Sequence, residues 1–182
     1  MFQTSLWLVL FPFIAEGLGF GYKSFTMTFV SITQSNASAV WDLSKTRLIG
    51  RERMLNGTAT LSENLTDDHW SFTVELYSDS TGEGNYKLLP FGIQNTPACK
   101  GYKKYRRYFS NHAKYGEQTD FPLHLDVCPI PKGTYFLKNI ILSEDGYPPF
   151  VHRGYLLVNG TYYYDGINTG YYTIVVRLED AE

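Results

Sequence analysis

The sequence has only two cysteines, Cys99 and Cys128, among its 182 residues. Two thiols exclude a four-cysteine zinc site and a framework of several disulfides. The four histidines are far apart, and none stands at a metal-ligand spacing such as H-x-x-x-H: His69, His112, His124 and His152. We therefore predict neither a metal site nor a cofactor.

The sequence also lacks the common catalytic signatures, because it contains no Gly-x-Ser-x-Gly elbow, phosphate-binding glycine loop or dinucleotide fingerprint. Its clustered acidic residues stand at predicted turns: Glu63, Asp67, Asp68, Asp79 and Glu83. Solvated turns explain these carboxylates better than a glycosidase pair, which must face one cleft at a fixed separation. We assign no catalytic residue and expect a protein without enzymatic activity.

No long apolar run follows the first twenty residues, so neither a membrane span nor a lipid anchor is expected. Residues 6–15 form a short apolar core that glycines follow closely, which is typical of a signal peptide. We predict a signal peptide over residues 1–17, with cleavage between 15 and 21, and a single domain over residues 18–182. The protein is then secreted and extracellular.

Secretion agrees with two further features of the sequence. Four Asn-x-Ser/Thr sequons predict glycosylation at Asn36, Asn56, Asn64 and Asn159. The even cysteine count permits one disulfide in an oxidising compartment. With no other thiol to pair with, Cys99 and Cys128 are predicted to close a loop of roughly thirty residues, a constraint of about 3 to 4 kcal/mol in the chain-entropy account.

Composition favours β-structure and argues against nucleic acid as a partner. The formal net charge is only −2, unlike that of a strongly basic nucleic-acid-binding domain. The chain has fifteen Tyr and twelve Phe, whose rings suit strands and provide large surfaces to bury or offer. Apolar and polar residues alternate around Phe25, Trp70 and Tyr172. About eight such segments with turns between them predict a two-sheet β-sandwich.

The segment between the cysteines is basic and aromatic and has no acidic residue between Cys99 and Gly116. Tyrosines recur there at spacings of three and four, which predicts a short amphipathic helix or an irregular insert. One interpretation is a helix that packs its rings over the open end of the sandwich and leaves its charges in solvent. Another is a surface for anionic lipid or an acidic partner, with transient membrane contact.

Several motifs resemble those of secreted insect proteins of the Che-A/Che-B chemosensory type, which are similar to the ML lipid-recognition superfamily that includes ganglioside activators. The motifs occupy residues 55–58, 86–91, 128–139 and 147–155. The most specific one is the string Cys-Pro-Ile-x-Lys-Gly-x-Tyr that begins at Cys128. Most members of that superfamily carry several disulfides, whereas this chain has at most one.

The resemblance implies an immunoglobulin-like β-sandwich whose sheets part to admit a lipid tail, and a role in pheromone or taste detection. If so, the inward strand faces line one apolar cavity: Phe25, Met27, Phe29, Trp70, Phe72, Val74, Leu76, Tyr135, Leu137, Ile174 and Val176. Basic side chains are expected at its rim: Lys103, Lys104, Arg106 and Arg107.

Three functions follow from these patterns. The leading one is a secreted, non-enzymatic binder of a hydrophobic small molecule or lipid in chemosensory detection. The second is an extracellular interaction protein that modulates a receptor or channel through its surface and has no ligand cavity. The third and weakest is a small secreted hydrolase, which requires titratable groups gathered in a cleft.

Overall fold

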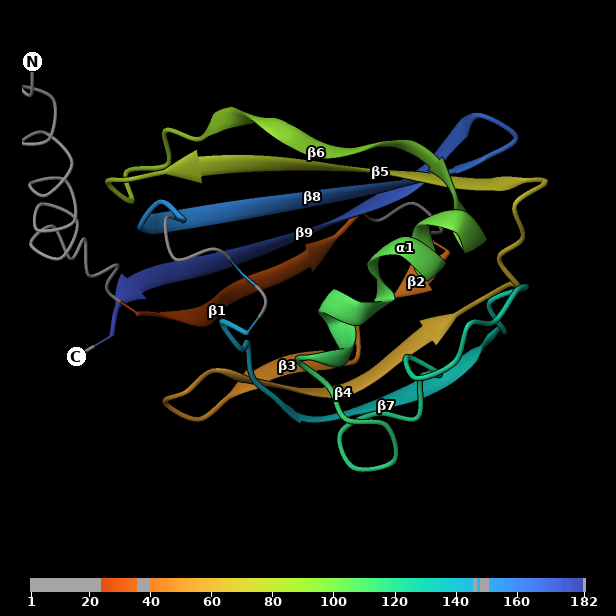
Figure 1. The fold of residues 1–182 in the computed structure, drawn as a ribbon, viewed down its shortest axis with the longest axis horizontal. Helices are drawn as coiled ribbons and strands as arrows, with labels where there is room; N and C mark the ends of the chain where they lie inside the picture. Colours follow the sequence, from red (N-terminus) through yellow and green to blue (C-terminus); the bar gives the residue numbers. More distant parts are fainter. Residues whose placement is uncertain (1–23, 36–39, 146, 148–150, 182) are drawn as a thin grey trace, which may run out of the picture.

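The structure, a computed structural model, describes residues 24–35, 40–145, 147 and 151–181. The predicted signal peptide and the sequon at Asn36 lie outside the described residues. Two antiparallel β-sheets and one helix make up the described part of the chain (Figure 1). The predicted all-β sandwich is confirmed.

The larger sheet has five strands in the order β1-β9-β8-β5-β6. Their bounds are Phe25–Gln34 for β1, Ile167–Asp180 for β9, Gly154–Tyr164 for β8, Trp70–Asp79 for β5 and Lys87–Pro97 for β6. The long pairing of β5 with β8 and of β8 with β9 makes the centre of the sheet continuous. Gly154–Tyr164 is therefore one strand, with its sequon inside it and the predicted Asp165-Gly166 turn after it.

The smaller sheet is built on β4, Met54–Leu61. β7, Gly133–Ile140, pairs along one edge of β4, while β2, Trp41–Asp42, and β3, Thr46–Ile49, pair in succession along the other. The described residues thus form nine strands, in agreement with the prediction of about eight.

The strand pairing has several register shifts, and two of them bear on the site. In β1 the register shifts between Phe29 and Ser31, so residues facing inward change from Phe25, Met27 and Phe29 to Ile32 and Gln34. Beside the Asn56-Gly57 pair the register of β4 with β7 also shifts, and the extra residue lies on β7, where Asn139 has a φ of 49°.

The cysteine loop begins with helix α1, Ala98–Ser110. Its second residue, Cys99, is bonded to Cys128, which confirms the predicted disulfide. The helix sits between the two sheets in Figure 1. A side chain at Gly101 would begin 2.3 Å from the Phe72 ring, so the helix approaches β5 as closely as glycine alone permits.

Buried side chains gather in two clusters between the sheets. The larger surrounds α1 and joins both sheets through residues such as Leu61, Trp70, Tyr102 and Tyr135. The smaller lies toward the start of β1 and the end of β9, and its buried members are Phe25, Val176 and Leu178. The interior is thus packed most tightly at two separate places.

Candidate functional site

The middle of the five-stranded sheet presents an inward apolar face that is only half-buried. Register places the following residues side by side on one face, because direct partners in an antiparallel pair share a face. The half-buried members are Met27, Ile32, Phe72, Val74, Leu76, Leu156, Val158, Tyr162, Tyr172 and Ile174. Their inward direction follows from the contacts of Phe72 with α1 and of Tyr162 with the larger cluster. We call these ten residues the inner row.

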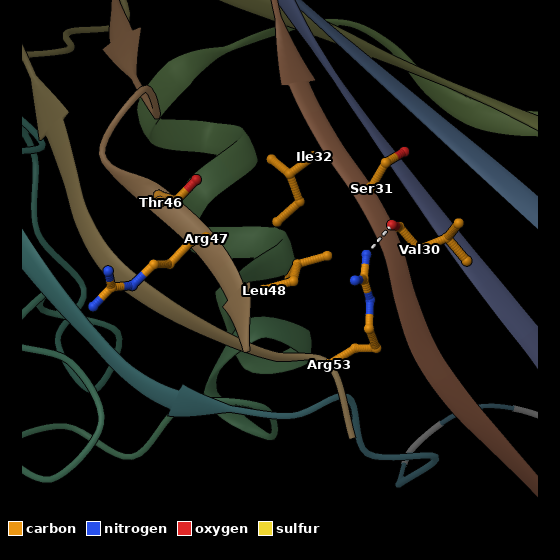
Figure 2. Close-up of a pocket in the computed structure, with 7 residues that line it drawn as sticks. All are labelled: Val30, Ser31, Ile32, Thr46, Arg47, Leu48 and Arg53. Atoms are coloured by element: carbon orange, nitrogen blue, oxygen red, sulfur yellow. Dashed lines mark hydrogen bonds between the residues drawn. The ribbon is translucent and has the colours of Figure 1, made fainter. Parts of the chain in front are cut away.

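A pocket of about 260 Å³ opens where the edge strands β1 and β3 of the two sheets meet. Its lining residues are Val30, Ser31, Ile32, Thr46, Arg47, Leu48 and Arg53. Figure 2 shows Ile32 and Leu48 pointing toward each other across this seam, with α1 visible behind them. Because Ile32 also belongs to the inner row, the seam pocket adjoins the interior face of the sheet.

The side chain of Arg53 forms hydrogen bonds across this seam to the backbone of β1. It lies in the turn between β3 and β4, and its φ of 55° is in the left-handed region. Its Nε donates to the carbonyl oxygen of Phe29 at 3.2 Å, and its Nη2 donates to that of Val30. Val30 stands at the β1 bulge, where the ladder to β9 skips a residue, so this carbonyl is available to the guanidinium.

The inner row contains two tyrosines in addition to its aliphatic side chains. The ring centroids of Tyr162 and Tyr172 are 6.1 Å apart, and Phe72 lies 6.0 Å from Tyr162 on the other side. Burial raises the pKa of Tyr172 to about 12. Burial also raises the pKa of Tyr162 well above its usual value, and Tyr172 adds to this, while a hydrogen bond from Trp41 opposes it. Both hydroxyls therefore stand in a poorly hydrated interior.

All eleven predicted cavity residues lie on inward-facing strand surfaces. Nine belong to the five-stranded sheet, and Tyr135 and Leu137 belong to β7. Five of the eleven are fully buried and six are half-buried: Phe25, Phe29, Trp70, Tyr135 and Val176 in the first group, and Met27, Phe72, Val74, Leu76, Leu137 and Ile174 in the second. Four of the five buried residues belong to the two core clusters, Trp70 and Tyr135 to the larger and Phe25 and Val176 to the smaller.

The four basic residues predicted at the rim all lie on α1, away from the residues that line the seam pocket. Lys103 pairs with Asp126 at 2.8 Å. Arg106 donates to the carbonyl of Leu123 at 3.1 Å, while its buried Nε has no partner among the described residues. Lys104 and Arg107 lie over the rings of the tyrosines that follow them. Two of the four thus fasten the helix to the loop that follows it.

A second, larger pocket of about 520 Å³ lies near the end of α1 and of β7. His112 is its distinctive residue: its Nδ1 accepts a hydrogen bond from the backbone N–H of Ser143 at 2.9 Å, and its ring stacks on Tyr147. Burial lowers the pKa of His112, an effect that Asp145 partly opposes. Charged and amide side chains line most of the rest of this pocket, together with Ile141 and Ser143.

The sequons differ in their surroundings, and two of them lie in strands rather than turns. Asn64 is exposed and accepts a hydrogen bond from the backbone N–H of Lys132. Asn56, in β4, uses both its amide nitrogen and its amide oxygen in backbone hydrogen bonds. Asn159 is half-buried on the outward face of β8.

Sequence reasoning missed Ile32, Leu48 and Arg53, and it left the two tyrosines out of the binding residues. The alternation along β9 already placed Tyr172 on the inward face, which was the signal available for it. For Arg53 the sequence holds no signal, since its role depends on where the edges of two sheets meet. Among the described residues no group of histidine, cysteine or carboxylate side chains is arranged to hold a metal ion, and no helix has the length and apolar character of a membrane span.

A comparison with known protein families finds a match for part of the chain. Residues 72–158 match the family described as "Protein of unknown function (DUF1091)". The DUF1091 match covers a little under half of the chain and runs from Phe72 in β5 through α1, the disulfide and β7 into β8. It thus includes most of β5, all of β6 and β7, and the first part of β8. No curated protein matches the chain, so the more specific likeness to Che-A/Che-B proteins stays a prediction.

Proposed function

We propose that this protein is a secreted, non-enzymatic binder of a hydrophobic small molecule or lipid, which enters between the sheets at the seam of β1 and β3. The observation that carries the proposal is the inner row, whose ten inward-facing side chains stay half-buried next to an open pocket. These residues keep accessible surface although they face the opposite sheet. The DUF1091 match supports the same function, since that family is found among proteins similar to the ML lipid-recognition proteins.

The energetics suit a chain-like ligand. Pockets for small molecules span about 300 to 1,000 Å³. The seam pocket, at about 260 Å³, therefore holds a ligand only if part of the ligand extends beneath the inner row. Burial contributes about 0.8 kcal/mol per methylene, so eight methylenes give roughly 6 kcal/mol before association costs are subtracted. Micromolar affinity corresponds to about 8.2 kcal/mol, so a longer buried chain or polar contacts must supply the remainder. Chemosensory detection of pheromone or taste molecules is the role we propose for such binding.

Displacement of a fluorescent apolar probe such as N-phenyl-1-naphthylamine tests this function. We expect long-chain lipids to displace the probe from the delipidated protein, and Val74→Arg to abolish probe binding because it places a charge in the inner row. Glu75→Arg, one residue along β5 on the opposite, exposed face, is the matched control. The proposal fails if the wild type binds neither probe nor lipid, or if both variants bind like the wild type.

A second function has an observation of its own. Strand β6 forms an edge of the larger sheet and carries two exposed apolar side chains, Leu88 at 61% and Phe91 at 59% exposure. Such an edge suits contact with a sensory receptor or channel, without any ligand between the sheets. Mass spectrometry of an organic extract of the protein purified from insect cells separates the two, because only the first function predicts a co-purified lipid.

A further inference from the structure

Four tyrosines have their rings in the interior, and they differ in what their hydroxyls do. The hydroxyl of Tyr102 donates to the carbonyl of Pro122, and that of Tyr135 donates to the carbonyl of Pro131. These two phenols follow the usual rule that a buried polar group finds a partner. Tyr162 and Tyr172, the two tyrosines of the inner row, lack such a carbonyl among the described residues.

Tyr172 is the better placed of the two to meet a ligand. Its ring lies across Gly160, the position on β8 that pairs with it, and the hydroxyl is 2.5 Å from where a side chain at that glycine would begin. No described residue forms a hydrogen bond with this hydroxyl. Tyr172 is half-buried, so part of the residue stays accessible.

We propose that the hydroxyl of Tyr172 donates a hydrogen bond to an oxygen of a neutral chain-like ligand, such as a long-chain alcohol, ester or ketone. This inference rests on the proposed function and names the ligand class for the same site. A hydrocarbon of equal length would leave the phenol unpaired, at the cost that any buried donor without an acceptor carries.

The path from the entrance leads to this hydroxyl. Ile32 lines the seam pocket and pairs with Ile174 on β9, and the next inward position of β1, Gln34, pairs with Tyr172. Tyr172 is the inward-facing residue next to Ile174 on β9, so a ligand that enters at the seam beside Ile32 comes next to Tyr172. Beyond it Val74 pairs with Gly160 and extends the apolar surface for the chain.

The residues around Tyr172 favour a ligand with a neutral oxygen group over a ligand with a carboxylate. No member of the inner row carries a charge, and burial there makes the charged form of a tyrosine costly, as the raised pKa of Tyr172 indicates. The same desolvation would penalise the carboxylate of a fatty acid, because a buried anion needs a cation or several donors. The alcohol, ester or ketone oxygen needs only one donor.

The variant Tyr172→Phe tests the inference, because it removes one oxygen and keeps the ring. Its matched control is Tyr171→Phe, whose side chain is 47% exposed on the opposite face of β9. The ligands are dodecyl acetate, 1-dodecanol, dodecanoic acid and dodecane, measured by displacement of N-phenyl-1-naphthylamine at pH 7.5. We expect the wild type to prefer the acetate and the alcohol, and Tyr172→Phe to weaken both about three- to tenfold while dodecane is unchanged.

The outcomes of these measurements distinguish failure of the hydrogen bond from failure of the proposed function. If Tyr172→Phe weakens all ligands equally or none of them, or if Tyr171→Phe has the same effect, the hydrogen bond is refuted while lipid binding stands. If the wild type itself binds dodecane or dodecanoic acid as tightly as dodecyl acetate, the inference falls without any variant. If the wild type binds none of the four ligands and no probe, the proposed function fails as well.

Discussion

Arg53 donates a hydrogen bond through its Nη2 to the carbonyl oxygen of Val30, which links the turn after β3 to the bulge of β1. These two strands are edges of different sheets, so this contact crosses the seam of the sandwich. A second bond, from Nε to the carbonyl of Phe29, fixes the plane of the guanidinium. The entrance to the proposed site is therefore framed by a side chain that also stabilises the fold.

Arg53→Met should loosen this seam. The variant loses both hydrogen bonds to β1 but keeps an unbranched side chain in place of the aliphatic part of arginine, and we expect a loss of about 1 kcal/mol in the free energy of unfolding. For a chain of this size that corresponds to a fall of roughly 2 to 4 °C in melting temperature. Arg51→Met, at an exposed neighbouring position, is the control. Equal melting temperatures for the two variants would contradict the role of Arg53.

The contact between α1 and β5 predicts that Gly101 tolerates no side chain. Alanine there would place its Cβ 2.3 Å from ring carbons of Phe72. We expect Gly101→Ala to lower the free energy of unfolding by about 1 to 2 kcal/mol, although alanine favours helix by up to about 1 kcal/mol. Lys104→Ala, at an exposed site on the same helix, should change stability little. Urea unfolding midpoints give the comparison, and a stabilised Gly101→Ala variant would show that the helix is packed more loosely than described.

The disulfide predicts a large loss of stability on its removal. The bond joins residues 29 apart in sequence and holds the start of α1 to the segment before β7. Changing both Cys99 and Cys128 to Ala should cost about 3 to 4 kcal/mol in the chain-entropy account. Urea unfolding measures the loss, and intact mass after alkylation without reductant checks the bond itself. Two alkylated thiols in the untreated protein would be incompatible with this structure.

The pH dependence of stability should reflect His112. Its Nδ1 accepts the N–H of Ser143 and so must be unprotonated, and burial lowers its pKa below the ordinary value of 6.5. The unfolded chain then binds more protons than the folded one near pH 6, so stability is fully present above pH 6.5 and decreases as pH falls toward the folded pKa.

His112→Asn should therefore flatten the loss of stability between pH 7.5 and pH 5, measured as the shift in urea midpoint. The exposed His69 acts in the opposite sense, because its hydrogen bond and charge interaction with Asp165 raise its pKa. That contribution is present at low pH and lost as pH rises, so His69→Asn should steepen the same decrease. If His112→Asn keeps the wild-type pH profile, the histidine is not held neutral by the fold.

Much of the candidate site could be predicted from alternation alone. Phe72, Val74 and Leu76 were expected on one face, and β5 places them there because a strand has a side-chain period of two wherever it pairs. The degree of burial could not be predicted in this way. Phe25 and Val176 are sealed in a core cluster while Val74 stays half-buried, and this difference depends on what the opposite sheet and α1 cover.

Local periodicity and counts of residue types were enough to predict the class of fold, the pairing of Cys99 with Cys128 and a short helix or irregular insert between them. The entrance and the polar contact inside it depend on how distant strands come together. Arg53 acts on Val30 because two sheet edges meet there and a bulge frees a carbonyl. The ring of Tyr172 lies against β8 because Gly160, its partner on that strand, has no side chain to occupy this space. Both depend on register between distant strands, which a local pattern of residues does not contain.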